Sequence, residues 1–499
     1  MTQPHHASLW TATADVPTFP PLAGGAETDV LVIGAGIVGL TLADLLKRAG
    51  RSVVLIEAKR IGAQVTGRST AKLTALQGLA YSQILEKHNL AAARSYAQAH
   101  SQAIEYVATR ATEAGIECDL RREPAFTVSE APDGMRRIHA EARAARDAGL
   151  AAEVVDSVPL PFPVAGAVRL DNQIAFHPQR YLAGLAHLVH GNAGQIFEQT
   201  RALSVEECRP SKVVTDRGTI RARDVVVTTH IPFLDRGLFF TKAFPRQHTV
   251  IAARIPEDKV PGGMCLAIDE PGWSVRSFHD DQGPILIATG TGNRPGHTDT
   301  LNEARRLETF ARERFGATEV LYRWTNQDYD SMDRLPYVGR MPGLDRVWLA
   351  TGFSAWGLSG GTAAAQLLAD LLEGRRGELA THWDARRWNL RKVGRDFLST
   401  NLHAGKEMIS DRLNARHAPP ADELAPGQGG VVRHQGGVVA AWRDESGTLT
   451  TFSANCTHLG CLVSWDPLEQ VWLCPCHGSV FDRQGRVVHG PAVRDLKRL

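Results

Sequence analysis

Residues 29–58 read DVLVIGAGIVGLTLADLLKRAGRSVVLIEA, and this stretch decides the fold of the N-terminal part of the chain. A β-branched run at 30–33 leads into the pattern G-x-G-x-x-G, whose glycines are Gly34, Gly36 and Gly39. The apolar spacing that follows predicts a helix ending at Gly50, and residues 53–56 predict a second strand that ends at Glu57. This strand–helix–strand unit is typical of an α/β dinucleotide-binding domain.

Each residue type in the unit has a physical role. Gly34, followed by Ala35, permits the tight turn, and Gly36 lets the backbone approach a pyrophosphate at the helix N-terminus. Gly39 lets helix and strand pack closely, and Glu57 accepts hydrogen bonds from a ribose. A glycine-rich turn in another kind of α/β domain is the alternative. The pattern does not separate FAD from NAD, but its position near the start of the chain favours a flavoprotein that retains its dinucleotide.

A second glycine-rich turn follows a strand expected at 347–351. Residues 352–362 read GFSAWGLSGGT, and an alanine- and leucine-rich helix continues to Leu372. The pattern predicts a helix N-terminus directed at a ligand. Taken alone, it also fits a buried glycine-rich turn.

At this point the chain resembles the D-amino-acid oxidase and glycine oxidase superfamily of FAD-dependent oxidoreductases over residues 27 to about 375. The resemblance implies an α/β FAD-binding domain, Rossmann-like and of the glutathione-reductase type, with an interleaved α+β substrate domain. It also implies a second flavin-contacting loop at 62–74. Outside the first glycine turn, the residues that it assigns to FAD are Arg68, Ser69, Thr70, Gly352, Gly357, Leu358 and Gly360.

The C-terminal region contains two cysteine- and histidine-rich segments, CTHLGC at 456–461 and CPCHGS at 474–479. Mixed ligation by two cysteines and two histidines suits a Rieske 2Fe–2S cluster, in which histidines replace thiolates on one iron. Zinc also accepts two of each but leaves two cysteines unexplained. Haem attachment requires C-x-x-C-H, and a disulfide-only loop does not need the histidines.

These segments resemble the Rieske domains of respiratory cytochrome bc complexes. The resemblance implies that Cys456 and Cys474 hold one iron, that His458 and His477 hold the other, and that Cys461 and Cys476 form a disulfide. It also implies a small all-β domain, with 490–492 as a proline loop that shields the cluster. The resemblance further implies that Ser479 supplies one of two hydrogen bonds to the cluster sulfurs, whereas Phe481 stands where those proteins have the second donor, a tyrosine.

Composition narrows the function further. The chain has 499 residues, 43% of them apolar, which is enough for two or three domains with ordinary cores. A net charge of +2 gives no reason to expect nucleic-acid binding. The seven cysteines do not form a secreted disulfide framework, and no leader or membrane span is evident, so we expect a cytoplasmic location.

The expected organisation has four parts. Residues 1–28 form an N-terminal arm, 29–372 the oxidoreductase, 373–424 a helical linker and 425–499 the Rieske domain. Within the oxidoreductase we expect the nucleotide-binding core at about 29–80, 150–230 and 331–372, a helical segment at 83–148 and the substrate sheet at about 232–330. The turn 216–218 should close a hairpin that returns to the nucleotide sheet.

The substrate residues are less clear, and no catalytic residue is assigned. Candidates in the second sheet are Trp273, Arg276, His297, Trp324, Asp328 and Tyr329, and possible bases are His230 and His248. Arg276 is a candidate clamp for a substrate carboxylate, or alternatively a surface ion pair. The aromatic residues fit a flavin-facing wall or an ordinary core equally well.

The combined pattern predicts FAD-dependent oxidation of an amine or amino acid, with electrons leaving one at a time through the cluster to an unidentified acceptor. It also resembles, over the whole chain, bacterial amine- or amino-acid-oxidase-like flavoproteins with a C-terminal Rieske domain. Two alternatives remain: a non-enzymatic redox-sensing or docking protein, and a plain oxygen-using amine oxidase with an auxiliary cluster. A Rieske oxygenase lacks support because no separate 2-His-1-carboxylate iron site is evident.

Overall fold

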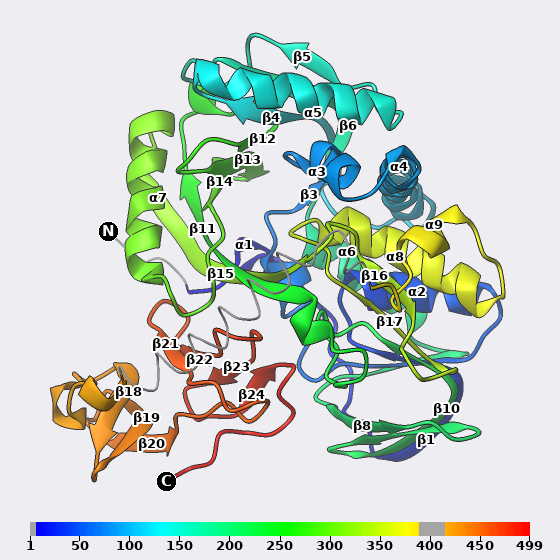
Figure 1. Cartoon of the computed structure of the whole chain (residues 1–499), viewed down its shortest axis with the longest axis vertical. Helices are drawn as coiled ribbons and strands as arrows, with labels where there is room; N and C mark the ends of the chain where they lie inside the picture. Colours follow the sequence, from blue (N-terminus) through cyan, green and yellow to red (C-terminus); the bar gives the residue numbers. More distant parts are fainter. Residues whose placement is uncertain (1–5, 389–414) are drawn as a thin grey trace.

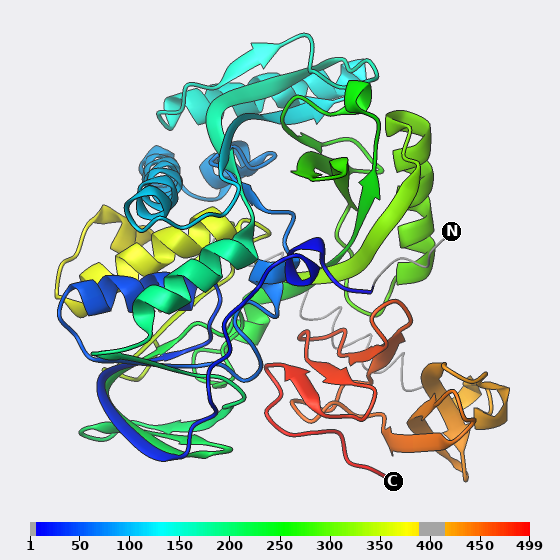
Figure 2. The same ribbon diagram turned by 180° about the vertical axis from the view of Figure 1, so that it is seen from behind.

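The computed structural model describes residues 6–388 and 415–499. Two large sheets with their helices form the oxidoreductase part, and two small sheets form the C-terminal domain (Figures 1 and 2). The C-terminal domain lies beside β15, at the side where the two large sheets meet (Figure 1). The part of the linker at 389–414 lies outside the described residues, so the expected helical linker is described only at its ends.

The first sheet has the order β16-β17-β10-β1-β2-β7. In addition, β9 pairs with β10, and β8 pairs with β9. The central strand β1 runs parallel to β10 on one side and to β2 on the other, so its buried residues 30–33 are covered on both faces. The expected hairpin at 216–218 joins β9 to β10. The strands are β1 (Gly24–Ile33), β2 (Val53–Ile56), β7 (Gly194–Phe197), β8 (Ala202–Glu206), β9 (Ser211–Thr215), β10 (Gly218–Val227), β16 (Tyr337–Arg340) and β17 (Val347–Thr351).

Helices cover this sheet because their apolar faces need a partner surface. The fingerprint helix α2 packs against α6 and α8, and α8 also packs against α4 (Figure 1). Their buried residues form one core with β1 and β2. The helices are α1 (Leu9–Ala12), α2 (Ile37–Arg48), α3 (Ala80–Lys87), α4 (Leu90–Glu113), α5 (Met135–Asp147), α6 (Pro178–Val189), α7 (Thr300–Phe315), α8 (Gly357–Leu372) and α9 (Glu378–His382).

The second sheet begins earlier in the chain than expected. Its order is β15-β11-β14-β13-β12-β4-β6-β3, with β5 attached to β6. Strands β3 to β6 therefore belong here, although 83–148 was expected to be helical and the region from 150 was assigned to the nucleotide core. The strands are β3 (Lys72–Leu73), β4 (Arg121–Ser129), β5 (Glu153–Val155), β6 (Gly166–Ala175), β11 (Ala243–Arg254), β12 (Met264–Ala267), β13 (Trp273–Asp280), β14 (Gly283–Gly290) and β15 (Glu319–Ser331).

The reason for this difference is tertiary pairing. β4 contains Pro124 at a register shift opposite β6, and its local pattern does not alternate cleanly. It is a strand because it pairs with β6 and β12, both distant in sequence, and strand preference depends strongly on such partners. The helices on either side gave the local signal that dominated the sequence prediction.

The N-terminal arm is shorter than expected, because β1 already begins at Gly24 and pairs there with β10. Before it, Trp10 on α1 is fully buried, and its indole N–H donates to the carbonyl of Ser69 over 2.7 Å. The Ser8 hydroxyl donates to the carbonyl of Gly67. The arm thus fixes the loop around the short helix η1 (Val65–Arg68).

The C-terminal domain consists of two antiparallel sheets, β18-β19-β20 and β21-β22-β23-β24. Its strands are β18 (Gly429–His434), β19 (Gly437–Arg443), β20 (Leu449–Ser453), β21 (Ser464–Asp466), β22 (Val471–Leu473), β23 (Val480–Asp482) and β24 (Val487–His489). A core that includes all four cysteines of this region lies between the sheets. Within residues 6–388 and 415–499, no helix combines the length and apolarity needed to cross a membrane.

Candidate functional site

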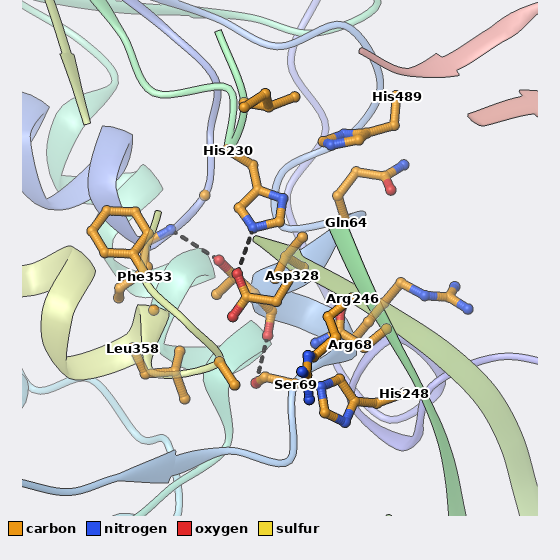
Figure 3. A pocket seen from close by; sticks show the side chains of 18 of the residues that line it. Gln64, Arg68, Ser69, His230, Arg246, His248, Asp328, Phe353, Leu358 and His489 are labelled. Carbon is orange, nitrogen blue, oxygen red and sulfur yellow. Dashed lines mark hydrogen bonds and ion pairs between the residues drawn. The ribbon is translucent and has the colours of Figure 1, made fainter. Parts of the chain in front are cut away.

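A cavity of about 420 Å³ lies where the first sheet, the second sheet and the C-terminal domain meet (Figure 3). Of the residues that the sequence assigned to FAD, eight line it: Gly34, Gly36, Glu57, Arg68, Ser69, Thr70, Gly357 and Leu358. The other four lie behind this wall: Ala35, Gly39, Gly352 and Gly360. The structure therefore brings the two glycine-rich turns and the 62–74 loop to one place.

The fingerprint turn forms a cradle that side chains would fill. Gly34 has a φ of 111°, and a Cβ at this position would lie 2.8 Å from the carbonyl oxygen of Thr228. A Cβ on Gly36 would lie 3.2 Å from the Thr66 hydroxyl oxygen, and one on Gly39 would overlap the carbonyl of Gly34. The cradle leaves the N-terminus of α2 open to the cavity, where it suits a phosphate.

Glu57 ends β2 at the edge of the same cavity. Its carboxylate accepts hydrogen bonds from the backbone N–H groups of Ala35 and Lys59, both over 2.9 Å. Burial raises the pKa of Glu57, and these two backbone bonds oppose the rise. The carboxylate is thus fixed next to the glycine turn, as a ribose ligand requires.

The late turn approaches the cavity from the other side. Gly352 has a φ of 77° and turns the chain out of β17, and Gly357 and Leu358 begin α8 at the cavity wall. Gly360 lies on α8 behind the cavity wall, and a Cβ at this position would lie 3.2 Å from the ring of His100. Gly352 and Gly360 therefore shape this wall without lining it.

Several candidates from the second sheet have structural roles instead. Arg276 is fully buried, does not line the cavity, and donates to the carbonyls of Ala71 and Phe176 while its guanidinium stacks over Trp10. It is neither a carboxylate clamp nor a surface ion pair, because the 71–73 strand and the arm bury it. The indole of Trp324 donates to the carbonyl of Arg68 over 2.7 Å, and His297 lies away from the cavity.

Other candidates do line the cavity, including Trp273 and His248. The Asp328 carboxylate accepts a hydrogen bond from His230 Nε2 over 2.8 Å, and both residues face the cavity (Figure 3). Tyr329, the next residue, is fully buried behind this wall. The His230–Asp328 contact is the kind of oriented imidazole that can hold a proton in a defined place.

Sequence reasoning missed several polar residues of the wall, among them Lys72, Arg246, Asn326 and His489. The Lys72 ammonium donates to the carbonyl of Cys265 over 3.0 Å and to the Ser274 hydroxyl. Burial lowers the pKa of Lys72 to about 7. The AKLT stretch at 71–74 gives no hint of this burial, which depends on the pairing of β3 with β6.

The cysteines of the C-terminal domain are divided into two pairs. Cys461 and Cys476 form a disulfide, with their Cα atoms 6.5 Å apart, as the sequence resemblance implied. The Sγ atom of Cys474 lies within 4.8 Å of both disulfide sulfurs, but a disulfide sulfur is no thiolate ligand. Cys456 and Cys474 are buried free thiols that hydrogen-bond to each other, a contact that lowers the pKa of Cys456.

Two histidines complete this group. The rings of His458 and His477 have centroids 5.1 Å apart, and the Nδ1 atoms of both are buried without a hydrogen-bond partner among the described residues. Two thiols and two unpartnered imidazole nitrogens at one place are the donor set of a Rieske cluster, so these residues fit a 2Fe–2S cluster. The glycine cradle, the α2 N-terminus and Glu57 likewise fit a dinucleotide.

The cluster motif lies directly against the oxidoreductase part. The Tyr329 hydroxyl donates to the carbonyl of His477 over 2.9 Å, and the Gln327 amide donates to the carbonyl of Gly478 over 2.8 Å. His458 Nε2 bonds to the carboxylate of Asp235 over 3.0 Å. Strand β15 therefore touches the cluster motif at one residue and the cavity at the next.

This fold and this pair of sites define a flavin-dependent oxidoreductase with an attached iron–sulfur domain. Residues 29–371 match the family model "FAD dependent oxidoreductase", and residues 416–499 match "Rieske [2Fe-2S] domain", which begins earlier than the boundary expected at 425. The chain belongs to this FAD-dependent oxidoreductase family, and its cofactors are FAD and a Rieske 2Fe–2S cluster.

Known relatives resemble the chain at different levels. The "Putative Rieske 2Fe-2S iron-sulfur protein YhfW" of Bacillus subtilis is 32% identical over 495 residues, which cover 99% of this chain and 97% of that protein. Gamma-glutamylputrescine oxidoreductase of Escherichia coli is 24% identical over 387 residues, covering 74% of this chain and 89% of that protein. The structure of glycine oxidase from Geobacillus kaustophilus shares the fold, with a TM-score of 0.61, 17% identity, and coverage of 73% of this chain and 99% of that one.

Proposed function

We propose that the chain oxidises the C–N bond of an amine or amino acid in the cavity and passes the two electrons singly to the Rieske cluster, from which a separate acceptor takes them. The observation that carries this proposal is strand β15. Asp328 lines the cavity, and Tyr329 donates a hydrogen bond to the carbonyl of His477 in the cluster motif. The two sites are thus connected through neighbouring residues of one strand.

The relatives support the substrate class. Gamma-glutamylputrescine oxidoreductase and glycine oxidase are named for substrates that contain an amino group. When bound, FAD supplies a hydride acceptor, and the cluster supplies a one-electron carrier. The residues of the chain enclose the substrate beneath the second sheet, in the cavity that Asp328 and Trp273 line.

For the cluster we propose Cys456 and Cys474 as ligands of one iron, and His458 and His477 as ligands of the other. Unpaired buried nitrogens are costly, so the two Nδ1 atoms are the proposed histidine donors. His458 Nε2 already bonds to Asp235, which orients the ring as outer partners of metal-bound histidines commonly do.

An anaerobic screen of amines and amino acids tests this function. A substrate should bleach the flavin absorbance first and the cluster absorbance afterwards in one stopped-flow trace. A redox-sensing protein would show no bleaching with any amine. A plain oxygen-using oxidase would bleach its flavin and leave the cluster oxidised throughout, and the flavin absorbance would return when oxygen is added.

Lys72 predicts a pH dependence of amine binding. Its pKa is lowered to about 7 by burial, so the side chain is charged below pH 7 and neutral above it. A charged Lys72 repels an ammonium substrate, and the KM for such a substrate should therefore be about tenfold higher at pH 6 than at pH 8. Steady-state kinetics of Lys72→Met should lack this step, whereas the control Lys212→Met, on β9 and outside the cavity wall, should keep it. Identical profiles for wild type and Lys72→Met would place Lys72 away from the substrate.

Because residue 481 is phenylalanine and not tyrosine, we expect the reduction potential of the cluster to lie below that of the respiratory Rieske proteins. The Phe481 ring is fully buried in the core that contains Cys456 and Cys474, and it has no hydroxyl to donate to the cluster sulfurs. One added hydrogen bond of about 1 kcal/mol should raise the potential of Phe481→Tyr by about 40 mV. A redox titration measures this, with Phe452→Tyr in the same core as the control. An unchanged or lower potential in Phe481→Tyr would show that position 481 does not face the cluster.

A further inference from the structure

The C-terminal domain contributes part of the wall of the FAD cavity. Five of its residues line this cavity: Val488, His489, Gly490, Ala492 and Val493. They follow from β24 into the proline loop that the sequence assigned to shielding the cluster. Part of this segment therefore belongs to the core of the cluster domain, and part of it lines the same cavity as the nucleotide-binding turn of the first sheet.

Among the imidazole nitrogens of the cavity wall that lack a partner in the described part of the chain, two lie where the domains meet. His230 Nδ1 and His489 Nε2 are both buried, and neither has a hydrogen-bond partner in the described part of the chain. The two ring centroids lie 5.5 Å apart, with one ring from each domain (Figure 3). A buried polar atom without a partner is costly, so both atoms call for a ligand that the polypeptide does not supply.

The chemistry of that ligand follows from the protonation of the two rings. The Asp328 carboxylate can only accept, so His230 Nε2 carries a proton towards it, and Nδ1 is the nitrogen left to bind a further polar group. Burial lowers the pKa of His489 to about 3, with smaller contributions from His230, Arg201 and Lys59, so this ring is neutral. A neutral imidazole suits hydroxyl and phosphate oxygens.

The surroundings place the hydroxyl- and phosphate-bearing part of a dinucleotide here. The same cavity contains Gly34, Gly36 and Glu57, which are built for the pyrophosphate and a ribose. Arg201, also in the wall, donates to the carbonyl of Val487 over 2.9 Å and so holds the start of the His489 segment against this region. The two free nitrogens therefore lie in the same cavity as the residues that are built for the sugar-phosphate chain.

We propose that His489 of the Rieske domain and His230 of the oxidoreductase part both bind the hydroxyl- and phosphate-bearing chain of FAD. The flavin site then spans two domains. FAD holds the Rieske domain in place, and the docked Rieske domain slows the release of FAD, because a ligand that binds only the docked arrangement stabilises it. This inference depends neither on the substrate nor on the direction of electron flow.

The release of FAD from the holoenzyme tests the proposal. After dilution into dilute urea, the rise of free-flavin fluorescence should be about tenfold faster for His489→Ala than for wild type, as expected for one lost hydrogen bond. His489→Gln, which restores a polar side chain, should recover most of the difference. His434→Ala, on β18 and away from the cavity, should release FAD at the wild-type rate.

The cluster spectrum separates binding from folding. All variants should keep the circular dichroism of the 2Fe–2S cluster, since neither histidine is among its proposed ligands. Wild-type release from His489→Ala with an intact cluster would overturn the proposal. If His489→Ala loses its cluster, His230→Ala tests the same site from the other domain: it should release FAD faster with the cluster intact, and wild-type release would refute the two-domain site.

Discussion

A Cys456→Ser variant should lose its iron–sulfur cluster and stop reducing acceptors that draw electrons from the Rieske domain, yet keep its FAD. Cys456 is buried beside Cys474 and lies outside the cavity wall. Serine retains the size of the side chain but removes the thiolate that iron needs. We expect iron to fall from about two atoms per chain to near zero, with the Rieske signal absent from electron paramagnetic resonance.

The same variant tests whether electrons pass from the flavin to the acceptor through the cluster. Substrate should still bleach its flavin at the wild-type rate, while turnover with one-electron acceptors falls to background. Cys208→Ser, which changes an exposed cysteine that belongs neither to the cavity wall nor to the cluster motif, is the control and should behave as wild type. Wild-type turnover of Cys456→Ser with every acceptor, including oxygen, would exclude the cluster as an obligatory relay. A retained Rieske signal would mean that the proposed ligand set is wrong.

The sites predicted best from the sequence are those whose residues lie within a few positions of one another in the chain. The turn from Gly34 to Gly39 and the cysteine and histidine spacing each encode a backbone shape or a ligand set within a few residues. The structure accordingly brings Gly34 and Glu57 into one cavity, and the disulfide between Cys461 and Cys476 is confirmed.

The residues that the sequence could not place depend on distant partners. Arg276 is buried by the N-terminal arm and Lys72 by the pairing of β3 with β6, and neither neighbour is visible from local spacing. His489 meets His230 only because the Rieske domain docks on β15. Strand β4 was missed for the same reason, since its partners β6 and β12 are remote in sequence.

One turn of the Rieske domain makes a further set of contacts with the oxidoreductase part. Between β21 and β22, the buried carboxylate of Asp466 accepts hydrogen bonds from the Gln247 amide over 2.6 Å and from the Thr300 hydroxyl over 2.7 Å. Three residues later, Glu469 forms an ion pair with Arg68 of the flavin loop. This turn, residues 466–470, is therefore called the polar latch: its hydrogen bonds and ion pair connect the cluster domain to β11, to α7 and to the flavin loop.

Asp466→Ala should open this latch. It leaves the Gln247 amide and the Thr300 hydroxyl buried without an acceptor, and it removes the carboxylate that also caps the backbone N–H groups of Leu468 and Glu469. The loss should be about 3 kcal/mol in the free energy of unfolding of the docked Rieske domain, measured by urea titration of the cluster circular dichroism. Hydrogen exchange at 466–470 should quicken by a factor of about a hundred for the same reason.

The matched control is Asp444→Ala. Asp444 also caps a turn of the Rieske domain, through the Ser446 hydroxyl and the Thr448 N–H, but its partners all lie within that turn. Asp444→Ala should cost less stability than Asp466→Ala, because no partner outside its own turn is lost, and it should leave exchange at 466–470 unchanged. With Asp466→Ala, flavin bleaching by substrate should keep its rate while the subsequent reduction of the cluster slows, because the latch holds the cluster motif against Tyr329. If both variants lost the same free energy of unfolding, or if Asp466→Ala reduced its cluster at the wild-type rate, docking would rest on β15 and not on the 466–470 turn.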